Sequence, residues 1–287
     1  MKSAYISYIL ALLLFGSNGI IASYINLTST EIVLYRTLIG SLLLLFLFMV
    51  NRNKWSFHKN KKHFFFLILS GISMGLSWMF LYEAYNRIGV SVSSLLYYCG
   101  PVIVMALSPV VFKEKLTRHR LTGFLAVFIG IILVNGNLVN SANNFWGIFC
   151  GAMSALMYSF MVIFNKKATN ISGLENSLLQ LTVSCITVAV FVLFKGNFSF
   201  YIPQSILLPL LFLGIVNTGI GCFLYFSKLE KLPVQSVSIL GYLEPLSAVV
   251  LSVIILNETM NIIQVTGALL VLGGAVFAEV GNHRNCQ

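Results

Sequence analysis

The chain has 287 residues, of which 58% are hydrophobic and only 9% are charged, and its formal net charge is +10. Because soluble domains carry roughly a quarter charged residues, so few charges cannot cover a water-facing surface, and the composition excludes an ordinary soluble protein. A strongly basic chain can also be a nucleic-acid-binding protein, but the positions of the basic residues, described below, argue against a nucleic-acid partner.

Ten apolar runs follow one another along the chain, each close to the roughly 20 residues that a helix needs to cross a bilayer. The first run follows Lys2 and is long enough to span, so we expect a transmembrane helix there and not a signal peptide. The expected fold is therefore an all-α integral membrane protein with ten transmembrane helices. The runs cover residues 4–24, 29–50, 64–86, 91–112, 118–136, 144–165, 173–195, 205–229, 234–256 and 260–280.

Lysine and arginine are distributed unevenly over the connections between these runs. Fifteen of the 18 lie at the two ends or in connections that share one side of the membrane; Arg87 and Lys195 lie on the other side, and Arg36 lies within a run. This asymmetry is typical of the positive-inside pattern. It predicts that both termini are cytoplasmic and that the protein resides in the inner (plasma) membrane, and it explains the basic composition without nucleic acid.

The second half of the sequence resembles the first. Phe80-Leu81-Tyr82 recurs 143 residues later as Phe223-Leu224-Tyr225. Each half contains five runs, so the second half would start on the opposite side of the membrane, which predicts two inverted repeats over 1–138 and 143–281. Inverted repeats are a common design of secondary transporters, with the substrate site between the repeats. At an offset of 144, the residues Glu31, Pro101, Glu114, Gly123 and Gly130 recur as Glu175, Pro245, Glu258, Gly267 and Gly274.

Several stretches also resemble a known family. Residues 96–101 with Glu114-Lys115-Leu116, and residues 241–245 with Asn257-Glu258-Thr259, are similar to the ends of EamA repeats, while Phe15-Gly16-Ser17-Asn18 followed by Arg36 is similar to the opening of the first repeat. The chain is thus identified as resembling the EamA type of the drug/metabolite transporter superfamily over nearly its whole length. The resemblance implies a ten-helix fold with a central cavity lined by both repeats, and transport of amino acids, other metabolites or drugs. The second repeat departs from the first by having Gln180 where the first has Arg36.

Three ionisable side chains stand out inside the runs, where charge is costly and often functional. Arg36 offers a guanidinium fork for a substrate carboxylate. The alternative is a structural pair with Glu31, Glu83 or Glu244, or with backbone carbonyls. Glu244 precedes Pro245, whose missing backbone donor interrupts the helix hydrogen bonds; it suits an ammonium group or, because burial disfavours the ionised form, a proton carrier. Its alternative is a protonated side chain bonded to a freed carbonyl. Glu83, near the end of its run, is a weaker candidate for the same role.

Aromatic and amide side chains complete the predicted substrate site. A tyrosine at membrane depth needs a partner for its hydroxyl, which favours the bundle interior or a cavity wall, and buried amides fix helix pairs or line cavities. The candidates are Asn18, Trp78, Tyr82, Tyr97, Tyr98, Tyr158, Asn217 and Tyr242.

These features predict a transporter and not an enzyme. All four histidines lie in predicted loops or the tail, aspartate is absent from the sequence, and no metalloprotease, nucleophile-elbow or P-loop motif occurs. We therefore expect no cofactor and no metal, and a secondary-active or facilitative transporter of a small metabolite, foremost an amino acid, with export favoured and alternating access at the repeat interface. An exporter of hydrophobic cations or drugs, a membrane enzyme and a channel stay open as alternatives. The expected partners are the substrate and the lipid bilayer; proton coupling or simple exchange, and a monomer or homodimer, are all compatible with the sequence.

Overall fold

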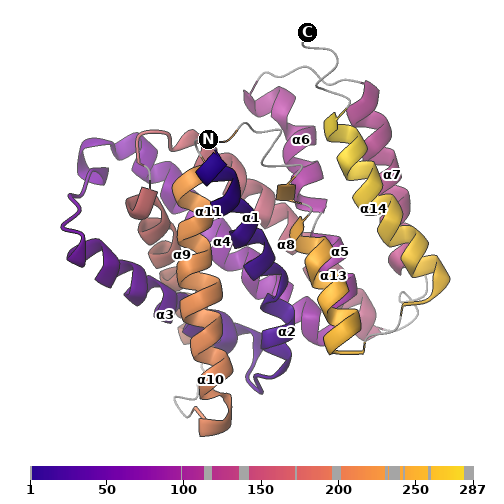
Figure 1. Cartoon of the computed structure of the whole chain (residues 1–287), viewed down its shortest axis with the longest axis horizontal. Helices are drawn as coiled ribbons and strands as arrows, with labels where there is room; N and C mark the ends of the chain where they lie inside the picture. The colour runs from indigo at the N-terminus through magenta and orange to yellow at the C-terminus, as the bar shows by residue number, and fades with distance from the viewer. Residues whose placement is uncertain are drawn as a thin grey trace.

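The computed structural model describes residues 2–97, 99–112, 118–135, 142–171, 173–195, 202–229, 232, 240–241, 243–257 and 260–280. These residues form helices and turns and contain no β-strand, as the composition predicts. The helices are α1 (Lys2–Gly16), α2 (Asn18–Ser23), α3 (Ser29–Val50), η1 (Phe57–Lys59), α4 (Lys61–Ile88), α5 (Val90–Tyr97), α6 (Cys99–Phe112), α7 (Arg118–Asn135), α8 (Ala142–Lys167), α9 (Gly173–Lys195), α10 (Gln204–Phe212), η2 (Leu213–Ile220), α11 (Gly221–Leu229), α13 (Leu243–Ile255) and α14 (Ile262–Val280) (Figure 1).

Six helical stretches within the described residues are long and apolar enough to cross a membrane. They coincide with six of the ten predicted runs, and the other four runs contain α5 with α6, α7, α13 and α14. Helix was therefore predicted correctly in every run, while the count of ten membrane crossings stays a prediction. The six stretches are Ala4–Ser23, Ser29–Val50, Lys61–Ile88, Phe145–Lys167, Gly173–Phe194 and Gln204–Ser227.

Two of these stretches depart from a regular α-helix. The first turns at Ser17, between α1 and α2, where the Ser17 hydroxyl donates to the Leu14 carbonyl at 2.7 Å. The stretch Gln204–Ser227 contains the eight-residue π-helix η2 between α10 and α11, with Pro209 inside α10. π-Helical turns are rare and occur mostly at functional positions, so both irregularities mark places to look for a site.

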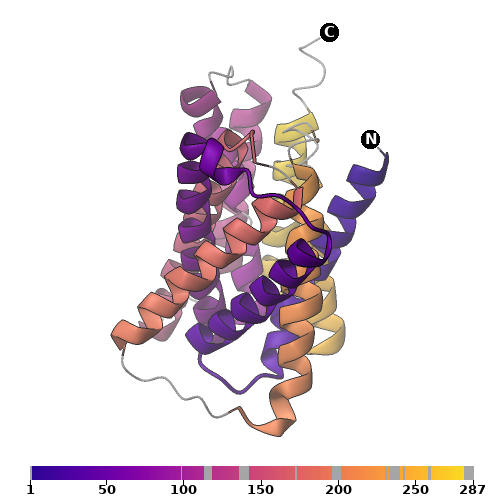
Figure 2. The ribbon, with the colours of Figure 1, turned by 90° about the vertical axis from the view of Figure 1, so that its left-hand side faces the viewer.

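The helices of the two halves pack against each other. α4 packs on α8 and α9, α3 packs on α9 and η2, and α1 packs on α11 and α13. Figure 2 shows α3 and α9 crossing the molecule side by side, and Figure 1 shows α7 and α14 standing together at its edge. In the predicted repeat, α4 corresponds to the stretch α10–η2–α11, α8 to α1 and α9 to α3. The α4–α8 contact then has its equivalent in the α11–α1 contact, and the α4–α9 contact has its equivalent in the η2–α3 contact. This pattern fits the predicted repeat.

Close helix contacts repeat this relation at single residues. A Cβ added to Gly71 would lie 2.7 Å from the Cβ of Val183, and a Cβ added to Gly214 would lie 2.7 Å from the Cβ of Ile39. Gly71 and Gly214 are 143 residues apart, and Ile39 and Val183 are 144 residues apart, which are the two offsets of the sequence repeat. The helices approach closely at these points because glycine has no side chain.

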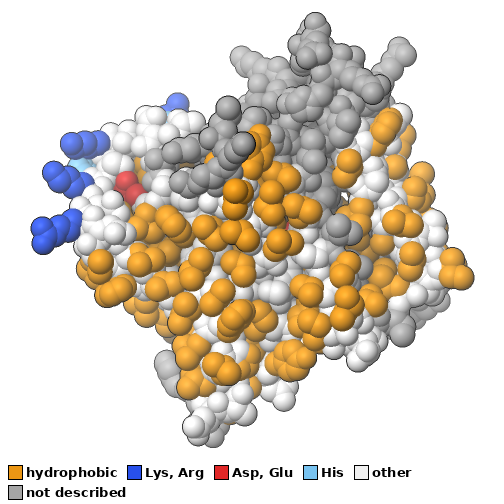
Figure 3. Space-filling view, viewed as in Figure 1, with side chains coloured by type: hydrophobic (Ala, Val, Ile, Leu, Met, Phe, Trp, Pro, Cys, Tyr) orange, Lys and Arg blue, Asp and Glu red, His pale blue; other side chains and the backbone are white. Residues whose placement is uncertain are grey.

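The surface separates apolar and basic regions. Hydrophobic side chains are spread over much of the described face seen in Figure 3, including the parts over α3, α10, α13 and α14, while lysine and arginine side chains gather at one edge. Phe194 is 88% exposed and Leu208 is 78% exposed. Apolar patches of such extent are unusual on water-soluble monomers and suit contact with lipid. The start of α1 and the end of α14 lie at the same end of the molecule (Figure 1).

The connection between α3 and α4 is tied to the second half of the chain. Glu175, in the first turn of α9, accepts hydrogen bonds from the backbone N–H groups of Ser56 at 2.7 Å and Phe57 at 2.9 Å. Its second oxygen accepts from the Ser56 hydroxyl at 2.5 Å. Glu31 instead caps its own helix α3, accepting from the backbone N–H of Thr28 at 2.9 Å. Equivalent glutamates therefore hold different partners.

Candidate functional site

A small cavity lies in the interior between the two halves, and its lining contains both Arg36 and Glu244. The cavity volume is about 20 Å³, room for about one water molecule. A metabolite can enter this space only if helices or side chains move apart. The lining residues are Phe15, Asn18, Arg36, Met74, Trp78, Leu81, Tyr97, Tyr158, Met161, Tyr225, Phe226 and Glu244.

Arg36 is fully buried and held by hydrogen bonds from three other elements. Its Nε donates to Thr218 Oγ1 of η2 at 2.8 Å, and its Nη2 donates to Asn18 Oδ1 of α2 at 3.3 Å. Its Nη1 donates to the hydroxyl of Tyr82 in α4. None of these partners carries a charge, so the guanidinium is hydrogen-bonded without being neutralised.

Two aromatic rings cover the guanidinium face. The Arg36 guanidinium carbon lies 4.3 Å from the centroid of the Trp78 ring and 5.2 Å from that of the Tyr82 ring. Such cation–π contacts stabilise a desolvated cation. Among the described residues, no carboxylate lies within ion-pair distance of Arg36, and the one ion pair found there joins Glu83 to Arg87. The predicted structural pairing of Arg36 with Glu31, Glu83 or Glu244 is thus not formed in this structure.

An amide pair supports Arg36 from the side of α2. Asn217 Nδ2 donates to Asn18 Oδ1 at 3.1 Å, to the Leu14 carbonyl at 2.8 Å and to Ser17 Oγ at 2.9 Å. The turn at Ser17 exposes these acceptors, because the chain is not continued there as a regular helix. The irregular positions of the first and eighth predicted runs therefore meet at the residues that hold Arg36.

Glu244 lies near the start of α13 and is 8% exposed, and α13 continues past Pro245 to Ile255. It lies near the side chains of Tyr8 and Tyr97. Glu244 therefore sits at the tyrosine side of the cavity lining that it shares with Arg36.

Aromatic rings from four helices pack together on that side. The Tyr158 and Tyr225 hydroxyl oxygens are 3.3 Å apart and hydrogen-bonded. The Tyr97 and Tyr158 ring centroids are 5.0 Å apart, as are those of Tyr8 and Tyr225. This aromatic wall, with Phe15 and Phe226, can pack against an apolar or aromatic group.

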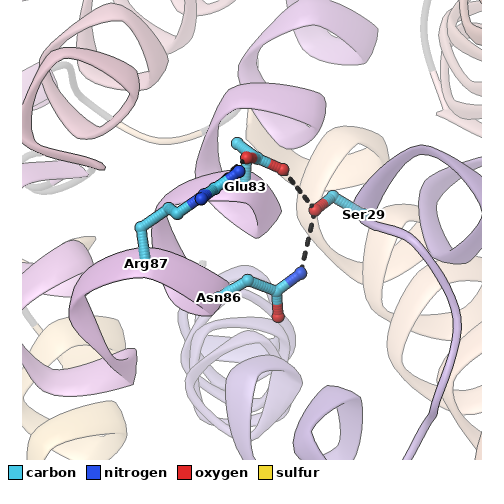
Figure 4. A network of polar contacts seen from close by, with 4 residues as sticks. All are labelled: Ser29, Glu83, Asn86 and Arg87. Carbon is cyan, nitrogen blue, oxygen red and sulfur yellow. Dashed lines mark hydrogen bonds and ion pairs between the residues drawn. The ribbon is translucent and has the colours of Figure 1, made fainter. Parts of the chain in front are cut away.

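Glu83 is placed outside the cavity lining, in a polar cluster between α3 and α4 (Figure 4). It accepts from the Ser29 hydroxyl at 2.9 Å and pairs with Arg87 at 3.0 Å. Asn86 Nδ2 donates to Ser29 Oγ at 3.0 Å and closes the cluster. The contacts of Glu83 favour its structural interpretation over a role in the site.

The position equivalent to Arg36 in the second half is held by neutral partners. Gln180 Oε1 accepts from Asn165 Nδ2 at 2.7 Å, and the same Asn165 donates to Asn176 Oδ1 at 3.0 Å. Gln180 Nε2 faces Met74 Sδ at 3.9 Å, and Met74 corresponds to Asn217 at the offset of 143. The halves therefore share a scaffold but place the buried cation on one side only.

The structure brings most of the predicted site residues to one place. The cavity is lined by six of them: Asn18, Arg36, Trp78, Tyr97, Tyr158 and Glu244. Two more lie next to this lining, because Tyr82 accepts a hydrogen bond from Arg36 and Asn217 donates one to Asn18. Tyr98 and Tyr242 lie outside the described residues, as do Glu114 and Glu258. Sequence reasoning missed Thr218, Met74 and Met161. Thr218 carried one usable signal, since it adjoins Asn217 in an otherwise apolar run.

Comparison with known proteins gives a consistent family match. The model described as the EamA-like transporter family matches residues 2–136 and again residues 145–279. An uncharacterized transporter of Bacillus subtilis, YxxF, is 26% identical over 288 residues, covering 97% of this chain and 90% of that protein. An uncharacterized inner membrane transporter of Salmonella typhimurium, YicL, is 23% identical and covers 100% of this chain and 98% of that protein.

A solved crystal structure has a similar fold. It aligns with a TM-score of 0.72 at 16% identity and covers 100% of both chains. At that identity the likeness concerns the fold alone.

Proposed function

The chain belongs to the EamA-like transporter family, and we propose that this multi-pass membrane protein carries a small zwitterionic metabolite, foremost an amino acid, across the membrane by alternating access between its two halves. Family and relatives are named as transporters. These names give no substrate, direction or mechanism, and all three are part of our proposal.

One observation carries the substrate class: a buried cation and a buried carboxylate line the same cavity, and no ion pair joins them. Arg36 is fully buried and stacked on Trp78, and Glu244 is 8% exposed at the tyrosine wall. A zwitterion presents a carboxylate to Arg36 and an ammonium group to Glu244. Its side chain would pack against the aromatic rings, which favours an apolar or aromatic amino acid.

The small cavity supports a transport cycle in which the substrate site opens and closes. About 20 Å³ of free volume holds no amino acid, so the state described is closed around the site. Loading requires the two halves to move relative to each other, as inverted-repeat transporters do. We further propose ten membrane crossings with both termini cytoplasmic, in the inner membrane, because the basic residues concentrate on one side. We favour export as the direction of transport, and both proton coupling through Glu244 and simple exchange are compatible with the site.

The decisive experiment is uptake into proteoliposomes holding the purified protein. Labelled amino acids and a few organic cations are screened with and without a proton gradient. Saturable flux of amino acids that falls in Arg36→Gln and in Glu244→Gln supports the proposal. Absence of amino acid flux from the wild-type protein would overturn the substrate class.

A second candidate, transport of a hydrophobic cation, is favoured by the aromatic lining beside Glu244. In that case Tyr97, Tyr158 and Tyr225 would surround the cation and Glu244 would neutralise it. Saturable cation flux that is unchanged in Arg36→Gln distinguishes this candidate, because Arg36 would then contact no substrate group.

A further inference from the structure

Asn18 is oriented by two donors that share one acceptor. Arg36 Nη2 and Asn217 Nδ2 both donate to Asn18 Oδ1, at 3.3 Å and 3.1 Å. The amide nitrogen of Asn18 is therefore turned away from both. Within the described part of the chain that nitrogen donates to no protein acceptor, and Asn18 is one of the residues that line the cavity.

The orientation of Asn217 follows from its partners. The Leu14 carbonyl and Asn18 Oδ1 can only accept, so the amide nitrogen of Asn217 must face them. Its own oxygen is left buried with no hydrogen-bond partner among the described residues. A buried acceptor without a hydrogen bond lowers stability and calls for an explanation. Here the same orientation of Asn217 that leaves its oxygen without a partner also fixes the orientation of the Asn18 amide.

The guanidinium of Arg36 is fixed from the other side by the π-helix. Thr218 Oγ1 accepts from Arg36 Nε and donates to the Leu213 carbonyl five residues earlier, at 2.7 Å. With single bonds to Thr218, Tyr82 and Asn18, Arg36 retains two of its five N–H groups without an acceptor in the described chain. The polar groups of Arg36 and Asn18 that lack an acceptor are therefore all N–H donors. A carboxylate has only acceptor oxygens, so it would satisfy them.

We propose that Asn18 is a second ligand of the substrate carboxylate, placing its Nδ2 beside the free N–H groups of Arg36, and that Asn217 is the residue that positions it. The inference rests on the proposed function and deepens it, because it assigns carboxylate selection to a charged and a neutral donor together. The ligands would come from the start of α2 and the middle of α3, and the positioning residue from η2 in the other half. A bound carboxylate would therefore connect two helices of the first half, while Asn217 of the second half would orient one of its ligands.

Asn18→Asp is the sharpest variant. It removes both donors and places a carboxylate next to Arg36, where it competes with the substrate. Asn18→Leu removes the donors without adding charge, and Asn217→Asp removes the donors that hold Asn18 Oδ1, freeing the Asn18 amide to turn over. Asn176→Asp is the matched control, because it changes a buried amide of the Gln180 cluster that lies outside the cavity lining.

The probes are L-phenylalanine, matched to the aromatic lining, and phenethylamine, which lacks the carboxylate. Proteoliposome uptake gives the KM of phenylalanine and the inhibition constant of phenethylamine for each variant that remains monodisperse. We expect the Asn18 variants and Asn217→Asp to raise the KM of phenylalanine about tenfold to a hundredfold, as for loss of a hydrogen bond to a charged group. The inhibition constant of phenethylamine should change less than about threefold, and Asn176→Asp should leave the ratio of the two constants as in the wild type.

The outcomes separate the two proposals. If the wild-type protein transports neither phenylalanine nor another amino acid, the proposed function fails and this inference fails with it. If it transports phenylalanine but Asn18→Leu keeps the wild-type ratio of the two constants, the carboxylate is held without Asn18 and this inference alone is overturned. If Asn18→Asp does not fold, Asn18→Leu and Asn217→Asp decide between the same results.

Discussion

Gly130 of α7 and Gly274 of α14 occupy matching positions, and each meets the backbone of the other helix. A Cβ added to Gly130 would lie 2.6 Å from the carbonyl oxygen of Gly267, and a Cβ added to Gly274 would lie 3.0 Å from that of Gly123. Both pairs of matching glycines are 144 residues apart. The same close contact is therefore made twice, once from each half.

Substitution of either glycine should separate α7 from α14. We expect Gly130→Ala and Gly274→Ala each to lower the free energy of unfolding by about 1–3 kcal/mol, because the added methyl group meets backbone that cannot yield by rotating a side chain. Thermal unfolding in detergent micelles measures the effect. Gly273→Ala is the control, since nothing lies within 4 Å of its added Cβ and alanine otherwise favours a helix. Equal stability of all three variants would contradict the prediction.

The hydrogen bonds of Arg36 predict that a positive charge alone at this position does not give normal substrate binding. Arg36→Lys keeps the cation but cannot reach Thr218, Tyr82 and Asn18 together, because lysine donates from a single nitrogen. We expect the KM of an amino acid substrate to rise about tenfold or more, the effect of losing hydrogen bonds to a charged group. The comparison is Arg87→Lys, which keeps its charge beside the partly exposed Glu83. A wild-type KM in Arg36→Lys would mean that Arg36 acts only through its charge.

Much of the fold and part of the site could be predicted from the sequence. Helix positions followed from the apolar runs, because an apolar run of about 20 residues satisfies its backbone hydrogen bonds within its own segment when it forms a helix. Arg36 and Glu244 were identified by the cost of burying a charge, and both line the cavity. Glu83 was predicted as a weaker candidate, and the structure places it outside the cavity lining and paired with Arg87.

The supporting groups around Arg36 could not be predicted in this way. Thr218 reaches Arg36 from the π-helix η2, and no residue pattern in the apolar run announces that change of helix geometry. The Asn18–Asn217 contact joins residues 199 positions apart, so it depends on how the halves pack. Residue type indicated that both amides were buried, and only the structure shows that they meet.

Glu244 is expected to determine the response to a proton gradient. If Glu244 carries the coupled proton, Glu244→Gln should abolish acceleration of uptake by an imposed gradient, because glutamine cannot release a proton. Exchange of substrate across the membrane should continue at a reduced rate, because the variant also loses the charge that meets the substrate ammonium group. Proteoliposome uptake with the gradient and counterflow without it measure the two activities. Glu83→Gln is the control: its carboxylate lies outside the cavity lining, so coupling should persist. Coupling that persists in Glu244→Gln would remove Glu244 from the proton path.

Glu175 should hold the connection between α3 and α4 against α9. Glu175→Ala removes three hydrogen bonds to one buried carboxylate, so we expect a loss of about 3 kcal/mol in unfolding free energy. Trypsin should then cleave faster after the exposed Lys54, because local opening of the connection admits the protease. Thermal unfolding and timed proteolysis in detergent measure both effects.

The comparison variant for Glu175 is Glu31→Ala, at the equivalent position of the first half. Glu31 accepts from the Thr28 backbone and hydroxyl and so caps its own helix, and we expect its removal to cost about 1 kcal/mol, the value of a helix cap. Cleavage after Lys54 should stay at the wild-type rate, because that cap lies at the other end of α3. Equal protease sensitivity of the two variants would show that general destabilisation, and not the contact between Glu175 and Ser56, controls access to the connection.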